Sequence, residues 1–408
     1  MSKTIIIIGA GLAGLSAALQ AAENGCNVKL VSSLPSERAQ SVMAEGGINA
    51  ALNTKDENDS PEEHFTDTIK AACGLADPNA VWGMTQAAPE LVHWLLKLGV
   101  KFNMSGYDDV DLRNFGGQKK KRTAFAQSDT GKQIMTAMID AVRRKEASGM
   151  VERFSHHSFL TLRLCGNICC GCVIRDEYSQ ETVELPGDAV IVATGGMHGL
   201  FGNTTGSLSN TGEVTAELFR LGVPLANGEM IQYHPTTVKC GGKRMLISEA
   251  ARGEGGRLFA MKDGKQWYFM EEKYPELGNL MPRDITAREI WKVSHESEVF
   301  LDMTEISEEI ISNKLSGLAD DCMTYLHKDI RKEPVSVLPG IHYFMGGILV
   351  DEQHRTPIQN LYAAGECCAQ YHGANRLGGN SLLGALYGGR VAAKSACEQA
   401  DVVDLSCA

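Results

Sequence analysis

The chain has 408 residues, of which 43% are hydrophobic and 22% charged, a balance typical of a globular protein with a large core. Its 39 basic and 50 acidic residues give a net charge of −11, which argues against nucleic acid or an anionic membrane as the main partner. No run of about 18 apolar residues occurs, so we expect no direct membrane span. Because no charged and apolar leader precedes the first strand pattern, a cytoplasmic location is expected.

The first residues predict a strand, a glycine turn, a helix and a second strand. Four isoleucines at 5–8 precede Gly9, Gly11 and Gly14, and apolar residues then recur at helical spacing. In a nucleotide-binding βαβ unit these glycines allow the tight turn, the close approach of a pyrophosphate, and the packing of helix on strand. Ser32 ends the second strand where an NAD-binding unit has an acidic residue, which weakens an NAD interpretation.

Later segments alternate in the same way. We expect helices at 60–69, 89–98 and 307–320, and a buried strand at 189–193 that ends in a glycine turn. From residue 228 to 339 the chain is richer in charge, and strand-and-glycine patterns return at 346–350 and 361–366. The prediction is an α/β fold: a discontinuous, doubly wound Rossmann-like domain (1–229 and 341–408) interrupted by an inserted α+β capping domain (230–340).

Twelve cysteines in a chain without a leader favour free thiols. Four of them flank a Gly-Asn turn with a spacing that fits no common zinc or iron–sulfur motif, so we expect a β-hairpin and no metal site; they are Cys165, Cys169, Cys170 and Cys172. For Cys367 and Cys368 packing is favoured, although a redox role stays open.

Two further segments are candidates for ligand binding. Residues 371–390 place several glycines and Arg376 on a turn that opens a helix, where free backbone N–H groups suit an electron-rich ring edge or a carboxylate. A basic run at 119–122 lies between Phe115 and Phe125. Such a run is usually a solvated loop, but an acidic protein with an anionic ligand needs local positive charge.

Four clusters combine charge with glycine or proline: residues 232–236, 248–256, 282–284 and 342–347. Together with 372–382, they resemble the flavoprotein subunits of fumarate reductase and succinate dehydrogenase, a family that also includes L-aspartate oxidase. The resemblance covers nearly the whole chain. It implies an FAD site at Gly9, Ala10, Gly11, Gly14, Ser32, Ser41, Glu45, Gly46, Gly47, Thr194, Gly195, Gly196, Glu213, Glu366, Arg376, Ser381 and Leu382. Glu213 stands where the family usually has aspartate.

The resemblance also implies a site for a C4 dicarboxylate. His234, Thr236, His342 and Arg376 match residues that hold the two carboxylates, and the substrate-binding set is completed by Phe115, Phe125 and Ser248. Arg283 matches the proton donor, supplied through Glu249 and Arg252. Such roles suit the reduction of an activated C=C bond, in which negative charge builds on a carboxylate.

Departures from the family pattern refine the expectation. Gln40 stands where membrane-bound members carry the histidine that links FAD covalently, so we predict dissociable FAD and the reductase direction. Phe115 replaces the glutamate with which aspartate oxidases pair the substrate ammonium, so the substrate should lack an amine. The chain stops shortly after Arg390, and the C-terminal helical domain of larger members is expected to be absent.

The leading hypothesis is therefore an FAD-dependent reductase of fumarate or a similar unsaturated dicarboxylate. No haem or iron–sulfur motif is present, so electrons must come from a partner protein, iron–sulfur or other, or from a reduced small carrier. Two alternatives stay open: an oxidoreductase of amino acids or other enoates with the same fold, and a flavin-carrying electron-transfer subunit without its own substrate.

Overall fold

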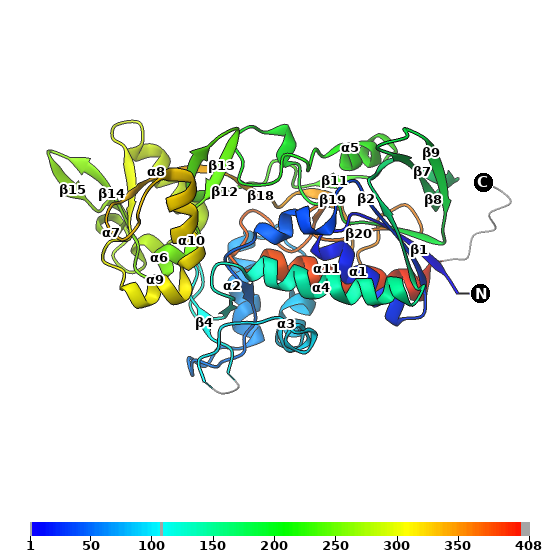
Figure 1. The fold of residues 1–408 in the computed structure, drawn as a ribbon, viewed down its shortest axis with the longest axis horizontal. Coiled ribbons are helices and arrows are strands. Elements are labelled where there is room, and N and C mark those ends of the chain that lie inside the picture. Colours follow the sequence, from blue (N-terminus) through cyan, green and yellow to red (C-terminus); the bar gives the residue numbers. More distant parts are fainter. Residues whose placement is uncertain (1, 107–108, 401–408) are drawn as a thin grey trace.

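A computed structural model describes residues 2–106 and 109–400 (Figure 1). Its centre is a five-stranded parallel sheet in the order β20-β10-β1-β2-β6. These strands are β1 (Thr4–Ile8), β2 (Asn27–Ser32), β6 (Val151–Ser155), β10 (Ala189–Val192) and β20 (Leu361–Ala363). Strands from the two ends of the chain pair with β10, so the sheet is discontinuous in sequence. The predicted α/β fold is confirmed.

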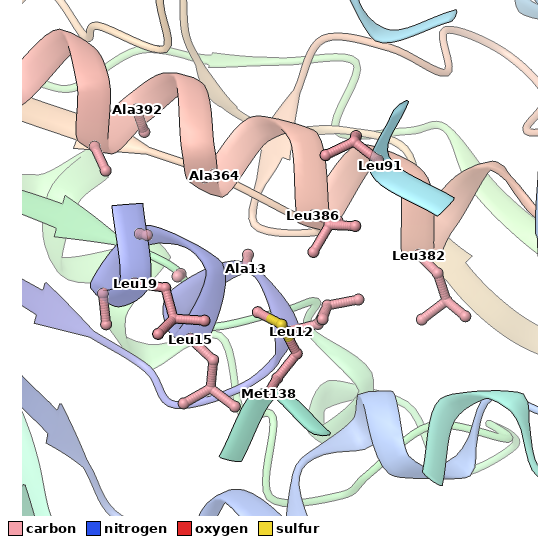
Figure 2. Packing of buried hydrophobic residues seen from close by; sticks show 14 of the residues in the cluster. Leu12, Ala13, Leu15, Leu19, Leu91, Met138, Ala364, Leu382, Leu386 and Ala392 are labelled. Atoms are coloured by element: carbon pink, nitrogen blue, oxygen red, sulfur yellow. The ribbon is translucent and has the colours of Figure 1, made fainter. Parts of the chain in front are cut away.

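One face of the sheet carries helices α1 (Leu12–Glu23), α4 (Thr130–Ala147) and α11 (Asn380–Gln399). Alternate residues of a strand point to opposite faces, and Ile5 and Ile7 of β1 belong to this helical core. Figure 2 shows Leu12 of α1 between Leu386 of α11 and Met138 of α4. A Cβ at Gly389 would overlap the carbonyl oxygen of Ala13, so α1 and α11 touch backbone to backbone.

The opposite face of the parallel sheet is covered mainly by a second sheet and not by a second layer of helices. There Ile6 and Ile8 pack against an antiparallel sheet of three strands together with helix α5. These elements are β7 (His157–Cys165), β8 (Ile168–Asp176), β9 (Thr182–Pro186) and α5 (Glu213–Arg220). The predicted cysteine hairpin is confirmed as β7 and β8. Burial raises the pKa of Cys169 and Cys172 to about 12, as expected for packed thiols. Within the described residues no cluster of His, Cys, Asp and Glu could hold a metal ion.

A second body of antiparallel sheets and short helices forms the cap, at the other end of the molecule's long axis from β7–β9 (Figure 1). Its sheets have the orders β13-β12-β18 and β15-β14-β16-β17. The strands are β12 (Ile231–Cys240), β13 (Lys243–Leu246), β14 (Arg257–Lys262), β15 (Lys265–Trp267), β16 (Val299–Asp302), β17 (Val335–Ser336) and β18 (Leu338–Phe344). The helices are α6 (Glu249–Gly253), α7 (Phe269–Lys273), α8 (Arg283–Val293), α9 (Glu308–Lys314) and α10 (Ser316–Asp321). The cap has its own core, but the exact boundaries at 229/230 and 340/341 stay a prediction.

Helices α2 (Pro61–Ala72) and α3 (Pro78–Leu98) complete the helical side. The predicted start of α3 at residue 89 was wrong. The helix begins eleven residues earlier, because Asp77 accepts hydrogen bonds from the N–H groups of Asn79 and Ala80 and Pro78 occupies the first helical position. Pro89 lies inside the helix. Smaller strands are β3 (Ile48–Asn49), β4 (Leu112–Arg113), β5 (Thr123–Ala124), β11 (Leu225–Ala226), β19 (Gly347–Leu349) and β21 (Cys368–Ala369).

In the part of the chain that the structure describes, every helix is too short or too polar to span a bilayer. The expected cytoplasmic location stays a prediction.

Candidate active site

A cavity of about 640 Å³ lies where the carboxyl ends of the parallel strands meet the cap. Its wall includes the glycine turn after β1, the end of β2, the turn after β10 and the N-terminus of α11. The cap contributes residues from β12, β13, α6, α8 and β18. The volume falls within the range of cofactor and ligand sites, and open α/β sheets bind ligands at this edge.

The glycine turn after β1 fits a dinucleotide. Gly9 has a φ of +111°, and a Cβ there would overlap the carbonyl oxygen of Ala193. Gly14 does not line the cavity; a Cβ at this residue would overlap the carbonyl oxygen of Gly9, so it packs helix against strand. Ser32, at the end of β2, lines the cavity with a buried hydroxyl that has no partner among the described residues. These features suit the pyrophosphate and ribose of a dinucleotide.

The other predicted FAD positions gather on the same wall. Those that line the cavity are Ala10, Gly11, Ser41, Glu45, Gly46, Gly47, Thr194, Gly195, Gly196, Glu213, Glu366, Arg376, Ser381 and Leu382. The hydroxyl of Ser41 also accepts a hydrogen bond of 3.3 Å from the N–H of Leu12, which holds the 40–43 turn at the start of α1. The residues present therefore fit FAD.

Glu45 has unusual electrostatics. Burial, together with the nearby carboxylates Asp321 and Asp129, raises its pKa to about 8, although Arg113 opposes this effect. Its Oε2 is buried without a partner among the described residues. A carboxyl group with this pKa is largely protonated at pH 7 and can donate a hydrogen bond to a ligand in the cavity.

The cap end of the cavity holds a buried ion-pair chain. Glu249 Oε2 accepts hydrogen bonds from Arg283 Nε at 2.9 Å and Nη2 at 2.6 Å. Arg252 Nη2 lies 3.3 Å from Glu249 Oε1. Burial raises the pKa of Glu249, but the two arginines outweigh it and the net shift is downward. Glu249 and Arg283 line the cavity whereas Arg252 lies behind them, so the chain leads from the interior to the cavity wall.

Two histidines line this end of the cavity from neighbouring paired strands, His234 on β12 and His342 on β18, with ring centroids 5.0 Å apart. Burial lowers the pKa of both imidazoles well below the usual value, and the charge of Arg283 lowers it further. Both rings are therefore neutral at pH 7. They can hydrogen-bond an anion, but the positive charge here comes from the arginines.

Arg376 supplies the second cavity-lining arginine at this end. Its guanidinium carbon lies 4.4 Å from the ring centroid of Tyr343, and Nη1 donates to the carbonyl of Leu377 at 3.2 Å. Burial, then the nearby charge of Arg283, lowers its pKa to about 9, and the group stays cationic at pH 7. Its Nε is buried with no partner among the described residues, so the guanidinium retains hydrogen-bonding capacity for an anion.

Two predicted substrate residues lie beneath the wall. Phe125 is fully buried under the guanidinium of Arg113, 3.6 Å from the ring centroid, and offers no surface to the cavity. Thr236 is also buried; its backbone contacts His234 Nδ1, and its hydroxyl donates to the carbonyl of Ile247. Thr236 therefore orients a histidine. Phe115 and Ser248 do line the cavity.

For the basic run at 119–122 the sequence left a solvated loop and a ligand-binding segment both open; the run does not line the cavity. Arg122 is fully buried and pairs with Asp59 at 2.7 Å and with Asp67 at 3.0 Å. The positive charge of this run neutralises acids of the neighbouring segment.

Three residues of the site were missed by sequence reasoning. Gln232 accepts a hydrogen bond from Arg283 Nη1 at 3.0 Å and donates to the carbonyl of Arg376 at 2.7 Å, so it spaces the two arginines. Gln232 belongs to the cluster at 232–236 that also contains His234, and this position could have marked it as a site residue. Arg244 lines the cavity with no ion pair among the described residues, and His198 is hydrogen-bonded to Glu366. Neither stands in a pattern that singles it out.

Comparison with known proteins agrees with this geometry. Residues 4–382 match the family described as FAD binding domain. The chain is 44% identical to the succinate dehydrogenase flavoprotein subunit of Bacillus subtilis, over 99% of this chain and 70% of that protein. It is 34% identical to an L-aspartate oxidase of Streptomyces coelicolor, over 96% of this chain and 68% of that one. A structure of an E. coli quinol fumarate reductase variant superimposes with a TM-score of 0.92 and 30% identity, covering 100% of this chain and 72% of that chain.

Fold, cavity and family together define an FAD-dependent oxidoreductase. More narrowly, the chain belongs to the family of succinate dehydrogenase and fumarate reductase flavoproteins, to which L-aspartate oxidase is also related.

Proposed function

We propose that the protein reduces fumarate, or a similar unsaturated dicarboxylate, with FAD held without a covalent bond. The observation that carries the proposal is the convergence of Arg283, Arg376 and two neutral histidines on one end of the FAD cavity. The Arg376 cation and the two imidazoles suit the two carboxylates of a C4 dianion, and Arg283 lines the same end of the cavity. Phe115 lines the same cavity and offers no anionic partner to an amine, which disfavours an amino-acid substrate.

In this proposal the side chains of the protein bind the dicarboxylate, orient it and supply the proton. Arg376, His234 and His342 hold the carboxylates and stabilise the charge that builds on one of them. Bound FAD would supply the hydride. Arg283 delivers the proton to the neighbouring carbon and regains one through Glu249 and Arg252. An arginine is ordinarily a poor acid, so its position matters: Glu249 and Gln232 hold the Arg283 guanidinium in place through hydrogen bonds.

The reaction can be tested without knowing the electron donor. Flavin in the purified protein is reduced anaerobically with dithionite, and fumarate is then added while the oxidised flavin absorbance is followed. We expect rapid recovery with fumarate and none with succinate or oxaloacetate. Bleaching of oxidised flavin by L-aspartate would instead favour the amino-acid alternative. Failure of every substrate, with copurification of an iron–sulfur protein, would favour an electron-transfer subunit.

The mode of FAD attachment gives a separate prediction. Gln40 lines the cavity on the turn that begins at this residue, and its amide cannot form the histidyl linkage. Precipitation of the protein with acid should therefore release all flavin into the supernatant. Flavin that stays in the pellet through a wash in denaturant would contradict the proposal.

We associate dissociable flavin with the reductase direction. We expect a partner protein or a small carrier to deliver the electrons, and we expect the protein to act in the cytoplasm.

A further inference from the structure

His198 is a fully buried residue of the turn that follows β10. Its two ring nitrogens have different partners. Nδ1 lies 2.8 Å from the hydroxyl of Thr204, and Nε2 lies 3.1 Å from Glu366 Oε1. The ring also stands edge-on to Phe344, with centroids 5.0 Å apart and an interplanar angle of 87°. Contacts on both nitrogens and on the ring edge fix the imidazole in one orientation.

On one side, His198 determines how Glu366 is presented. Glu366 Oε1 also accepts a hydrogen bond of 3.0 Å from the N–H of Phe344, so two donors can hold the same oxygen. Oε2 takes part in neither contact, and the side chain of Glu366 lines the FAD cavity. A carboxylate held through one oxygen presents the other in a fixed direction, which lowers the entropy lost when a ligand hydroxyl binds it.

On the other side, His198 supports the turn that holds His342. The hydroxyl of Thr204 accepts a hydrogen bond of 3.0 Å from the N–H of Gly206, and the next residue, Thr205, has its hydroxyl 2.7 Å from His342 Nδ1. A Cβ at Gly206 would overlap the ring of His198, so ring and turn are in close contact. A displacement of His198 therefore displaces the turn, and with it the partner of His342.

We propose that His198 is a positioning residue that fixes Glu366 toward FAD and, through Thr204 and Thr205, fixes His342 toward the substrate. The proposal rests on the proposed function, because it takes the flavin and the dicarboxylate to occupy this cavity. In this proposal His198 touches neither ligand, and its imidazole connects the FAD site with the substrate site through Glu366 and Thr204.

Two substitutions separate the two arms. In His198→Gln the side-chain amide reaches the position of Nε2 and can still bond Glu366, whereas in His198→Asn it reaches the position of Nδ1 and can still bond Thr204. FAD affinity is measured by diluting the holoenzyme and following free-flavin fluorescence. Because a hydrogen bond to a charged group is worth more than a neutral one, we expect His198→Asn to raise the FAD dissociation constant about tenfold. His198→Gln should leave that constant near the parent value.

The second arm is read from the kinetics of reduced enzyme with fumarate. His198→Gln should raise KM several-fold with little change in kcat, because it loses the support of Thr204, while FAD-saturated His198→Asn should keep a KM near that of the parent. His295→Gln, at an exposed site in the cap, is the matched control and should change neither constant.

Equal losses in both substitutions, accompanied by a lower melting temperature, would show that His198 only fills space, and would overturn the proposal. Parent-like FAD affinity in both would do the same for the Glu366 arm. If the parent itself fails to react with fumarate, the proposed function fails, but the FAD measurements still decide the Glu366 arm.

Discussion

Replacing Arg283 by alanine is expected to lower kcat for fumarate reduction by about 10³-fold while FAD stays bound. The substitution removes the cavity-lining guanidinium that is hydrogen-bonded to Glu249, and thus the proposed proton donor. Arg376 and the two histidines remain to bind the dianion, so KM should change much less than kcat. Stopped-flow reoxidation of reduced flavin by fumarate measures both constants, and the flavin absorbance per mole of protein reports FAD retention.

The matched control is Arg288→Ala on the same helix. Arg288 is largely exposed and lies 3.9 Å from Asp284, so its loss removes the same charge from α8 without touching the cavity. Turnover should be unchanged. If Arg283→Ala kept a substantial fraction of the parent rate, another group would have to deliver the proton, and the role assigned to Arg283 would be refuted.

Replacing Arg122 by methionine is expected to lower the free energy of unfolding by about 3–5 kcal/mol, the usual cost of breaking a buried ion pair. The change leaves the carboxylates of Asp59 and Asp67 buried without their cation. Thermal or urea unfolding of the flavin-loaded protein measures the loss.

The loss should depend on pH. Burial already raises the pKa of Asp59, and Arg122 acts against that rise. Without the arginine the folded-state pKa rises further above the unfolded value. Folding then favours the protonated form, so the stability of the variant falls as pH increases through that range. The deficit relative to the parent should therefore be smaller under acidic conditions than at neutral pH.

Lys121→Met tests whether any cation of the basic run would do. Its ammonium lies 3.7 Å from Glu57, and half of its side chain is exposed, so the substitution should cost less than about 1 kcal/mol. If the two substitutions lowered the free energy of unfolding by similar amounts, burial of the Arg122 ion pairs would not explain the cost of losing Arg122.

Much of the fold followed from patterns that are local in sequence. The isoleucine strand, the three glycines and the helical spacing after them predicted the nucleotide-binding unit, because strand, turn and helix are adjacent in the chain. The cysteine hairpin followed from its turn for the same reason. The start of α3 was misplaced because Pro89 was taken as the first residue of the helix. The N-cap Asp77 followed by Pro78 is the stronger helix-start signal.

The candidate site shows the limit of such patterns. The motif residues were named from sequence, and most of them line one cavity. Nothing in the sequence distinguishes Phe115 from Phe125 as a candidate for substrate binding. In the structure Phe115 lines the cavity, whereas Phe125 is covered by Arg113. The sequence left open whether the basic run is solvated or faces a ligand, and the fold pairs its Arg122 with Asp59 and Asp67.

By itself, then, the sequence determined the nucleotide-binding unit, the family and the set of candidate site residues, because these are encoded in short stretches. Only the tertiary structure decided which charges cancel one another and which remain for a ligand. It also joined His198 to Glu366 across 168 residues of chain. The reason is physical: burial and pairing depend on contacts between distant segments, and no local spacing records which segments will meet.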